Sequence, residues 1–316
     1  METKTSNSPI DISVVVPVYN EEESLAELSQ QIEDALSREY SYEIFFVDDG
    51  SSDTSWSEIK KLSEKHSNIH GIAFSHNYGK SAALQAGFEA SKGTYVVTMD
   101  SDLQDDPAEV PEMIQMLKDG YDLVSGWKKE RHDPISKTIP SKFFNYVTRK
   151  VAGIELHDFN CGLKAYRAEV VEDIYLYGEL HRYIPMLAKK EGYTRITEKI
   201  VEHHPRKYGK TKFGLSRFMN GFLDLVTLTF VQRYLQKPMH FFGTIGVLML
   251  LIGGGINLYI AYTKLILGQA IGDRPLLFLG ILLMVLGVQL LSTGLLGEMI
   301  NKNNVEGQKP RIREKV

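Results

Sequence analysis

Short apolar runs alternate with longer amphipathic stretches along the first two thirds of the chain. The runs at residues 12–18, 42–47 and 69–74 are rich in β-branched and aromatic residues, which favour strands. We expect further strands at residues 95–99, 123–126, 163–166 and 195–201, and helices at residues 20–36, 54–65, 79–90, 106–118, 136–151 and 180–191. Strands that alternate with helices in this way predict an α/β fold, a mostly parallel sheet flanked by helices.

Local signals mark where several of these elements begin and end. Pro17 is expected to end the first strand. Asn20, followed three residues later by Glu23, predicts a capping box that opens the helix at residues 20–36. Asp106 and Pro107 predict another helix start, with the aspartate as cap and the proline in the first turn.

The last third of the chain has a different pattern. Residues 239–262 and 275–296 are two apolar runs without a single Asp, Glu, Lys or Arg. About 20 such residues are enough to cross the hydrocarbon layer of a membrane as a helix. The alternative is a pair of buried core helices in a soluble protein. The short connector at residues 263–274 predicts that the two helices form a transmembrane hairpin.

Basic residues are more frequent on the outer flanks of this hairpin than in its connector, which holds only Lys264 and Arg274. The positive-inside tendency therefore places both ends of the chain in the cytosol and predicts a multi-pass protein of the cell (inner) membrane. The run Gly253 to Gly255 permits close helix packing or marks a flexible point of the first span. Gly-rich faces of paired hairpins also make a homo-oligomer plausible.

Between the two parts, residues 215–235 mix apolar positions with charges, as in a helix that lies in the membrane interface. An ordinary helix packed on the domain is the alternative. The resulting prediction has four segments: a cytosolic domain at residues 1–213, an amphipathic juxtamembrane helix at 214–237, two transmembrane helices within 238–298, and a charged cytosolic tail at 299–316.

Charge and cysteine content narrow the possible partners. The formal net charge of −4 provides no basic field for a nucleic acid. The single cysteine, Cys161, excludes an intrachain disulfide and fits a reducing compartment. The polar N-terminus has none of the features of a signal peptide, so we expect the first domain to stay in the cytosol.

Acidic clusters follow three of the predicted strands. Asn20 and Glu21 come after the first strand, Asp48 and Asp49 after the second, and Asp100-Ser101-Asp102 after the fourth. In an open parallel sheet, ligands bind beyond the carboxyl ends of the strands. Two carboxylates one residue apart can both reach a Mg²⁺ or Mn²⁺ ion, which would neutralise a diphosphate. A turn with a helix cap is the alternative, but Asp106 already serves as that cap.

Several motifs together resemble the inverting glycosyltransferases of family 2, which have the GT-A fold. Within that family the chain is similar to the polyprenyl-phosphate glycosyltransferases, such as dolichyl-phosphate mannose synthase and bactoprenol glucosyltransferase. The motifs are VVVPVYNEEESL (14–25), FFVDDGSSDTS (45–55), HNYGKSAALQAGFEASKG (76–93), VVTMDSDLQDDPAEVP (96–111), CGLKAYR (161–167), HHPRKYGKTKFG (203–214) and LLGEMI (295–300). They span nearly the whole chain.

The resemblance implies specific roles for residues at these motifs. It implies that a nucleotide-sugar, linked to UDP or GDP, is bound by Pro17, Tyr19, Glu21, Asp49, Asp100, Ser101 and Gln104, with Asp49 on the base. Asp100, Asp102 and Gln104 would surround the metal and the diphosphate. Arg131 resembles an arginine near the phosphates, and Arg206, Lys210 and Lys212 resemble a basic loop that closes over them; for each, a solvated surface charge is the alternative.

The implied reaction moves the sugar to a membrane polyprenyl phosphate, undecaprenyl or dolichyl phosphate, with inversion at C1. Asp158 matches an acidic position near the acceptor, as an orienting residue or a base, although a turn or cap is the alternative. Some relatives carry a second aspartate where this chain has Cys161 and Gly162. A phosphate acceptor is already ionised at pH 7, so the chemistry does not require a strong base.

Two other functions compete with this one. A processive polysaccharide synthase of the same superfamily would carry a Gln-x-x-Arg-Trp motif and more spans, and Gln232-Arg233-Tyr234 does not have that spacing. A non-catalytic membrane adaptor or lipid carrier would have lost the D-x-D motif or the basic loop, and both are present.

Overall fold

The computed structural model describes residues 10–129, 145, 148–150, 152–208, 238–268, 270 and 275–305, without the side chains of 300–305. The chain divides into two compact units, with the boundary between Met219 and Asn220. Each unit is described by itself below.

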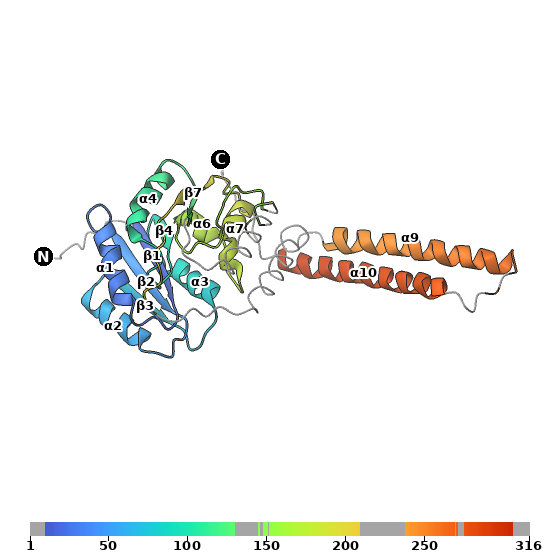
Figure 1. The fold of residues 1–316 in the computed structure, drawn as a ribbon, viewed down its shortest axis with the longest axis horizontal. Helices are drawn as coiled ribbons and strands as arrows, with labels where there is room; N and C mark the ends of the chain where they lie inside the picture. Colours follow the sequence, from blue (N-terminus) through green and yellow to red (C-terminus); the bar gives the residue numbers. More distant parts are fainter. Residues whose placement is uncertain are drawn as a thin grey trace. The chain divides into compact units, whose positions relative to one another are not determined.

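The first unit is built on one sheet in which seven described strands have the order β3-β2-β1-β4-β6-β5-β7. Figure 1 labels β1 to β4 and β7 of this sheet. All neighbouring strands are parallel except at β6, which runs antiparallel to both β4 and β5. The strands are β1 (Ile12–Val18), β2 (Tyr42–Asp48), β3 (Ile69–Ala73), β4 (Tyr95–Thr98), β5 (Leu123–Trp127), β6 (Lys164–Arg167) and β7 (Ile196–Ile200). The predicted α/β fold with a mostly parallel sheet is thus confirmed.

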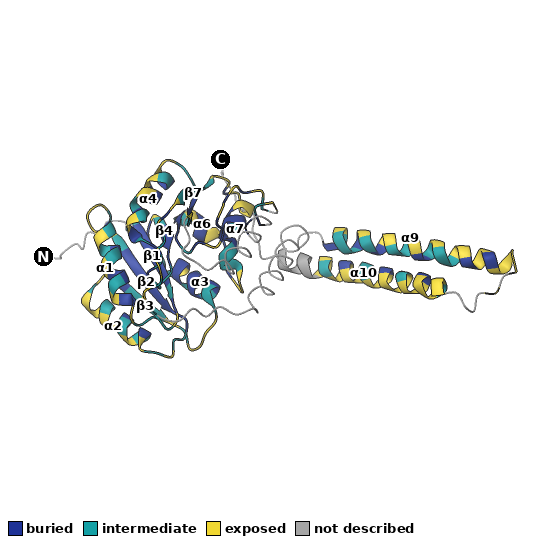
Figure 2. Ribbon diagram, viewed as in Figure 1, coloured by how far each residue is buried: buried dark blue, intermediate teal, exposed yellow. Residues whose placement is uncertain are grey.

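Helices cover both faces of this sheet, because successive residues of the buried strands point to opposite faces. Val14 and Val16 pack in one cluster with α1 (Leu25–Leu36), α2 (Ser55–Lys65) and α4 (Val110–Lys118). Val15 packs in the other, with α3 (Lys80–Ala90), α6 (Ala168–Asp173) and α7 (Ile184–Lys190). The central strands β1, β2 and β4 are therefore mostly buried, as their dark colour in Figure 2 shows, whereas the edge strands β3 and β7 are partly exposed.

Pro17 lies inside β1 instead of ending it. Val15 O accepts a hydrogen bond from Met99 N beside β4, and Val18 O accepts one from Asp49 N on the β2 side. By alternation, Pro17 faces the β4 side, where the paired residues stop at Val15 and Thr98. A proline without an N–H is tolerated there because no partner strand needs its donor.

The predicted capping box at Asn20 and Glu23 is wrong. Helix α1 begins at Leu25, and Ser24 precedes it without a side-chain cap. Asn20 has a φ of +56° and its side chain accepts a hydrogen bond from Ser52 N at 2.8 Å. Asn20 therefore joins the loops after β1 and β2, and the helix starts one turn later than predicted.

The other predicted elements differ in detail. Asp106 caps as expected, accepting a hydrogen bond from Ala108 N at 2.8 Å, but the first turn is the 3₁₀ helix η1 (Pro107–Glu109). The helix expected at residues 180–191 begins as the 3₁₀ helix η2 (Leu180–Tyr183) before α7. Most of the helix expected at 136–151 and all of the juxtamembrane helix expected at 214–237 lie outside the described residues.

The second unit contains two long apolar helices, α9 (Pro238–Leu265) and α10 (Pro275–Val305). Both are long and apolar enough to cross a membrane. Much of their apolar surface is exposed: Leu258 has 74% of its surface accessible and Phe278 has 70% (Figure 2). That exposure argues against buried core helices of a soluble protein.

Glycines bring these two helices together. A Cβ atom on Gly246 would lie 2.7 Å from Gly287 O, and one on Gly253 would lie 2.6 Å from Gly280 O. From the first pair to the second, the residue number rises along α9 and falls along α10. The helices are therefore antiparallel, as a hairpin requires. A Cβ on Gly254 would meet nothing within 4 Å. Gly253 is therefore a packing position, and the predicted self-association of the hairpins stays a prediction.

Candidate active site

A cleft with a cavity volume of about 360 Å³ lies at the carboxyl ends of β1, β2 and β4. Its lining includes the predicted residues Pro17, Tyr19, Glu21, Asp49, Asp100, Ser101 and Asp102. It also includes residues to which sequence reasoning gave no role: Val18, Asn77, Gly79, Lys80, Glu179, His181 and Arg182. The sheet thus gathers three acidic loops and a set of cations around one opening.

Asp49 fixes the loop that precedes α3. Its buried carboxylate accepts hydrogen bonds from Tyr78 N at 2.7 Å and Gly79 N at 2.9 Å. Burial raises the pKa of Asp49, and these two backbone donors act against that rise. Gly50, with a φ of +69°, makes the close approach possible, because a Cβ there would lie 2.5 Å from the His76 backbone. The loop is thereby held against the end of β2.

Asp100 follows β4 and forms an ion pair with Lys80, the first residue of α3. Burial opposes ionisation, but the Lys80 ammonium outweighs it and holds the pKa of Asp100 below its ordinary value. A Cβ atom on Gly162 would lie 2.6 Å from Asp100 Cγ. Glycine at position 162 therefore lets the chain before β6 lie directly against this carboxylate.

Asp102 is in the opposite electrostatic situation. Burial and the neighbouring carboxylates of Asp100 and Asp105 raise the pKa of Asp102 to about 6, although Arg206 acts against the shift. Asp102 Oδ1 accepts a hydrogen bond from Gln104 N at 3.3 Å, across Leu103, whose φ is +58°. A non-glycine residue in that conformation is uncommon and marks a tightly constrained turn.

Gln104 does not line the cleft. Its side-chain amide donates to His204 O at 3.4 Å, and its backbone O accepts from His204 N at 3.0 Å. Gln104 thus joins the acidic turn to the segment after β7. Nearby, the buried Asp105 carboxylate lies 2.7 Å from Lys128 Nζ, and this carboxylate raises the pKa of Lys128 against the effect of burial.

Arg206 connects two sides of the cleft. Its guanidinium forms an ion pair with Glu21, after β1, and Nη1 lies 3.8 Å from Asp102 Oδ2. Its Nε donates to Tyr208 O at 2.8 Å, which fixes the arginine on its own segment. The basic segment after β7 therefore reaches the acidic turn, as far as the described residues extend.

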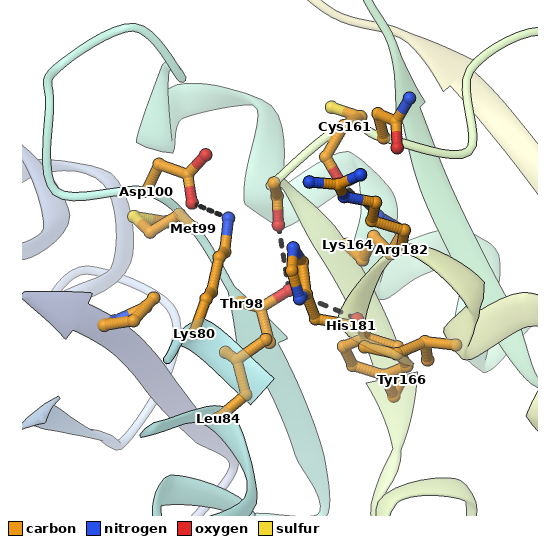
Figure 3. A pocket seen from close by; sticks show the side chains of 14 residues that line it. Lys80, Leu84, Thr98, Met99, Asp100, Cys161, Lys164, Tyr166, His181 and Arg182 are labelled. Atoms are coloured by element: carbon orange, nitrogen blue, oxygen red, sulfur yellow. Dashed lines mark hydrogen bonds and ion pairs between the residues drawn. The ribbon is translucent and has the colours of Figure 1, made fainter. Parts of the chain in front are cut away.

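A smaller inner pocket, with a cavity volume of about 20 Å³, continues from the cleft past Asp100 (Figure 3). Lys80, His181 and Arg182 line both spaces, whereas Lys164 and Tyr166 of β6 line only the inner one. His181 Nδ1 lies 3.0 Å from Ser81 Oγ. Burial and the cations around it, with Lys80 foremost, hold the pKa of His181 well below its ordinary value, so its imidazole is neutral.

The remaining predicted site residues fall elsewhere. Asp158 is 1% exposed and lines neither space; its Oδ1 accepts a hydrogen bond from Asn160 N at 3.1 Å, as in a turn. Arg131, Lys210 and Lys212 lie outside the described residues.

The acidic turn suits a divalent cation. Asp100, Asp102 and Asp105 bring three carboxylates together, and burial, followed by repulsion from the other two, raises the pKa of Asp102. Carboxylate oxygens are the ligands that Mg²⁺ and Mn²⁺ prefer. Lys80 and Lys128 already neutralise Asp100 and Asp105, which leaves Asp102 as the carboxylate that gains most from a cation.

Comparisons with known proteins agree with this geometry. A family model described as Glycosyl transferase family 2 matches residues 13–175. The chain is 38% identical over 303 residues to a dodecaprenyl-phosphate galacturonate synthase of Rhizobium johnstonii, covering 93% of this chain and 90% of that protein. It is 38% identical over 299 residues to an undecaprenyl-phosphate 4-deoxy-4-formamido-L-arabinose transferase of Pseudomonas aeruginosa, covering 93% of this chain and 86% of that one.

Solved structures share the fold. Glucosyl-3-phosphoglycerate synthase from Mycobacterium tuberculosis, in complex with Mn²⁺ and UDP-glucose, has a TM-score of 0.52 at 20% identity, covering 72% of this chain and 80% of that one. The mannosyltransferase PcManGT from Pyrobaculum calidifontis, with GDP-mannose and Mn²⁺, has a TM-score of 0.52 at 17% identity, covering 96% and 77%.

Proposed function

The chain belongs to glycosyl transferase family 2, and we propose that it moves a sugar from a nucleotide-sugar donor to a polyprenyl phosphate in the membrane, inverting the configuration at C1. The observation that carries this proposal is the combination, in one chain, of the acidic cleft around Asp100 and Asp102 with two exposed apolar helices. A soluble acceptor would not require such helices, whereas a long-chain lipid phosphate is reached from the membrane. The relatives named for polyprenyl-phosphate products match 93% of the chain.

The donor cleft offers separate ends for the parts of a nucleotide-sugar. Tyr19, Glu21 and Asp49 provide the nucleoside end, because they follow the first two strands. Asp100 and Asp102 provide the diphosphate end. A divalent cation, Mg²⁺ or Mn²⁺, would be held by these two carboxylates and, when bound, would neutralise the charge that develops on the leaving diphosphate.

The chain's own cations act at the same place. Lys80 keeps Asp100 ionised, and Arg206 favours the ionised form of Asp102. Both residues thereby keep the acidic turn ready for a cation. Preorganised charges of this kind are usually the largest contribution to such a reaction.

The acceptor phosphate needs no strong base, since its second pKa is near 6 and it is ionised at pH 7. One of its oxygens attacks C1 of the sugar, and the bond from C1 to the diphosphate breaks. Asp158 is buried and accepts a hydrogen bond from Asn160 N, so we assign it to positioning the segment before β6.

The same proposal covers location. Both flanks of the hairpin carry more basic residues than its connector, so the catalytic domain and both ends of the chain face the cytosol. The chain is then a multi-pass protein of the cell membrane.

Incubation of membranes that contain this protein with labelled UDP- and GDP-sugars and polyprenyl phosphate tests the function. We expect a lipid-extractable product with one sugar per phosphate and inverted configuration, and no product with Asp102→Asn. A sugar polymer would instead identify a processive synthase, and release of free sugar alone would exclude transfer to lipid.

A further inference from the structure

The inner pocket has a strong excess of positive charge. Lys80, Lys164 and Arg182 all line it, and among the lining residues that the structure describes Asp100 is the one carboxylate. Asp100 is already paired with Lys80. In Figure 3 these side chains come from three different elements, α3, β6 and η2, around a common space. The fold therefore collects cations here from separate parts of the chain.

Lys164 is the least expected of these cations. It is 3% exposed, and its ammonium donates to Cys161 O. Among the residues that the structure describes, Lys164 forms no ion pair, although the carboxylates of Asp158 and Asp100 favour its charged form from farther away. A buried ammonium without a counter-ion is strongly unfavourable in a folded protein. Burial accordingly lowers the pKa of Lys164. A bound anion would supply the missing charge.

Arg182 extends this region toward the cleft. Its side chain is 18% exposed and its Nη2 lies 3.1 Å from Glu179 Oε2, a half-exposed carboxylate at the rim. The imidazole of the neighbouring His181 is neutral, so it adds no positive charge to that of Lys164 and Arg182.

The position of the pocket identifies which part of a donor it would meet. The cleft begins at Tyr19 and Asp49, continues to Asp100, and opens there into the inner pocket. If the nucleoside lies at the first end and the diphosphate near Asp100, the group that follows the diphosphate is the sugar. This step rests on the proposed function.

We propose that the inner pocket binds a carboxylate on the donor sugar, so that the preferred donor is a nucleoside diphosphate uronic acid. Lys164 and Arg182 form charge-assisted hydrogen bonds to the carboxylate, and a neutral sugar leaves the buried Lys164 without a counter-ion. Sites built around a buried polar partner discriminate strongly against substrates that lack it. The competing explanation is that these cations serve only the diphosphate, in which case uronic acids and neutral sugars bind alike.

Paired donors separate the two explanations. Binding of UDP-galacturonate, UDP-glucuronate and GDP-mannuronate to the full-length protein in detergent is compared, by calorimetry with Mn²⁺, with that of UDP-galactose, UDP-glucose and GDP-mannose. Each pair differs only by a carboxylate in place of a hydroxymethyl group. We expect one uronate to bind at least about tenfold more tightly than its neutral partner, the scale of one charge-assisted hydrogen bond. Equal binding in every pair, or no uronate binding, overturns the proposal.

Transfer to polyprenyl phosphate is measured separately with the same donors. Transfer of neutral sugars in preference to uronates would leave the proposed function standing and remove this inference. Uronate binding without any transfer to lipid would support this inference and contradict the proposed function.

Two variants give a further check that does not depend on overall activity. Lys164→Met and Arg182→Gln should each lower the ratio of uronate to neutral affinity about tenfold, because each removes one charge from the pocket. Lys65→Met, on the exposed end of α2, is the matched control and should leave the ratio unchanged. If both donors of a pair weaken equally in both pocket variants, these side chains are structural and the assignment fails.

Discussion

Lys80 and Asp100 form an ion pair across the mouth of the inner pocket, although one opens helix α3 and the other follows strand β4. A cation in the first turn of a helix is unfavourable next to the positive end of the helix dipole. The partner carboxylate compensates for this position. The pair thus joins the loop after β3 to the acidic turn, and the Lys80 ammonium keeps Asp100 ionised.

Replacement of Lys80 should therefore act through Asp100. In Lys80→Met we expect the pKa of Asp100 to rise and the affinity for Mn²⁺ to change in a pH-dependent way, with kcat/KM reduced about tenfold or more. Lys80→Arg keeps the charge and should retain most of the activity. A Lys80→Met enzyme with an unchanged pH profile would show that the pair has no influence on the acidic turn.

Asp102→Asn should remove activity and stabilise the metal-free protein. The raised pKa of Asp102 means that the folded state binds its proton more tightly than the unfolded state does. Stability without metal then falls as pH rises from about 4 through about 6, where the carboxylate ionises. The asparagine avoids that loss, so its unfolding free energy at pH 7 should exceed that of the native chain by on the order of 1 kcal/mol. Calorimetric melts in EDTA at pH 5 and 7 measure this difference.

The same pKa predicts the acid limb of the activity profile. Below about pH 6, Asp102 becomes protonated and loses its affinity for a cation, so kcat/KM should fall. Saturating Mn²⁺ should move this limb to lower pH, since a bound cation competes with the proton. A limb that does not respond to metal concentration would assign the titration to another group.

Arg206→Ala should move that limb in the opposite direction. Arg206 favours the ionised form of Asp102, so its loss should raise the pKa of Asp102 and shift the acid limb upward. It also leaves Glu21 without its arginine. We expect transfer to slow more than nucleotide binding weakens. Arg206→Lys keeps a charge and serves as control, and a profile that is identical in both variants would contradict the assignment.

Two adjacent glycines test the packing of the apolar helices. Gly253→Ala would place a methyl group 2.6 Å from Gly280 O, whereas Gly254→Ala would meet nothing within 4 Å. The first should destabilise the helix pair by about 1–3 kcal/mol, as overpacking generally does, and the second should have little effect. Thermal aggregation in detergent micelles, followed by size-exclusion chromatography, compares them. Equal melting temperatures would mean that α9 and α10 do not pack as described.

The sequence predicted the parts of the fold that depend on continuous patterns. Apolar runs located β1, β2 and α9 to within a few residues, since burial and length determine them, but α10 continues to Val305, past the predicted end of the apolar run at residue 296. Loop geometry could not be predicted in this way. Asn20 has the sequence pattern of a helix cap, yet its side chain accepts a hydrogen bond from Ser52 N, which is distant in sequence. Short-range patterns cannot report such a contact.

The candidate site likewise contains residues that the sequence could place and residues that it could not. Asp49, Asp100 and Asp102 follow strands and could be placed at the cleft from strand order alone. Lys164 could not, because inside a strand a lysine reads as a solvent-facing position, and only the antiparallel insertion of β6 buries it. Lys80 gave a usable signal, a cation at a helix start, which indicates a nearby acidic partner.

The antiparallel course of β6 has an evolutionary consequence. Its starting end lies beside the finishing ends of β4 and β5, so residues from Asn160 to Arg182 form one side of the inner pocket, opposite Lys80 and Asp100. If the inner pocket selects the sugar, as proposed, substitutions in this later stretch would change the transferred sugar and leave the residues Tyr19 and Asp49 at the nucleoside end unchanged. A chimera in which this stretch comes from a relative with a different sugar would inherit the relative's sugar on the host's nucleotide.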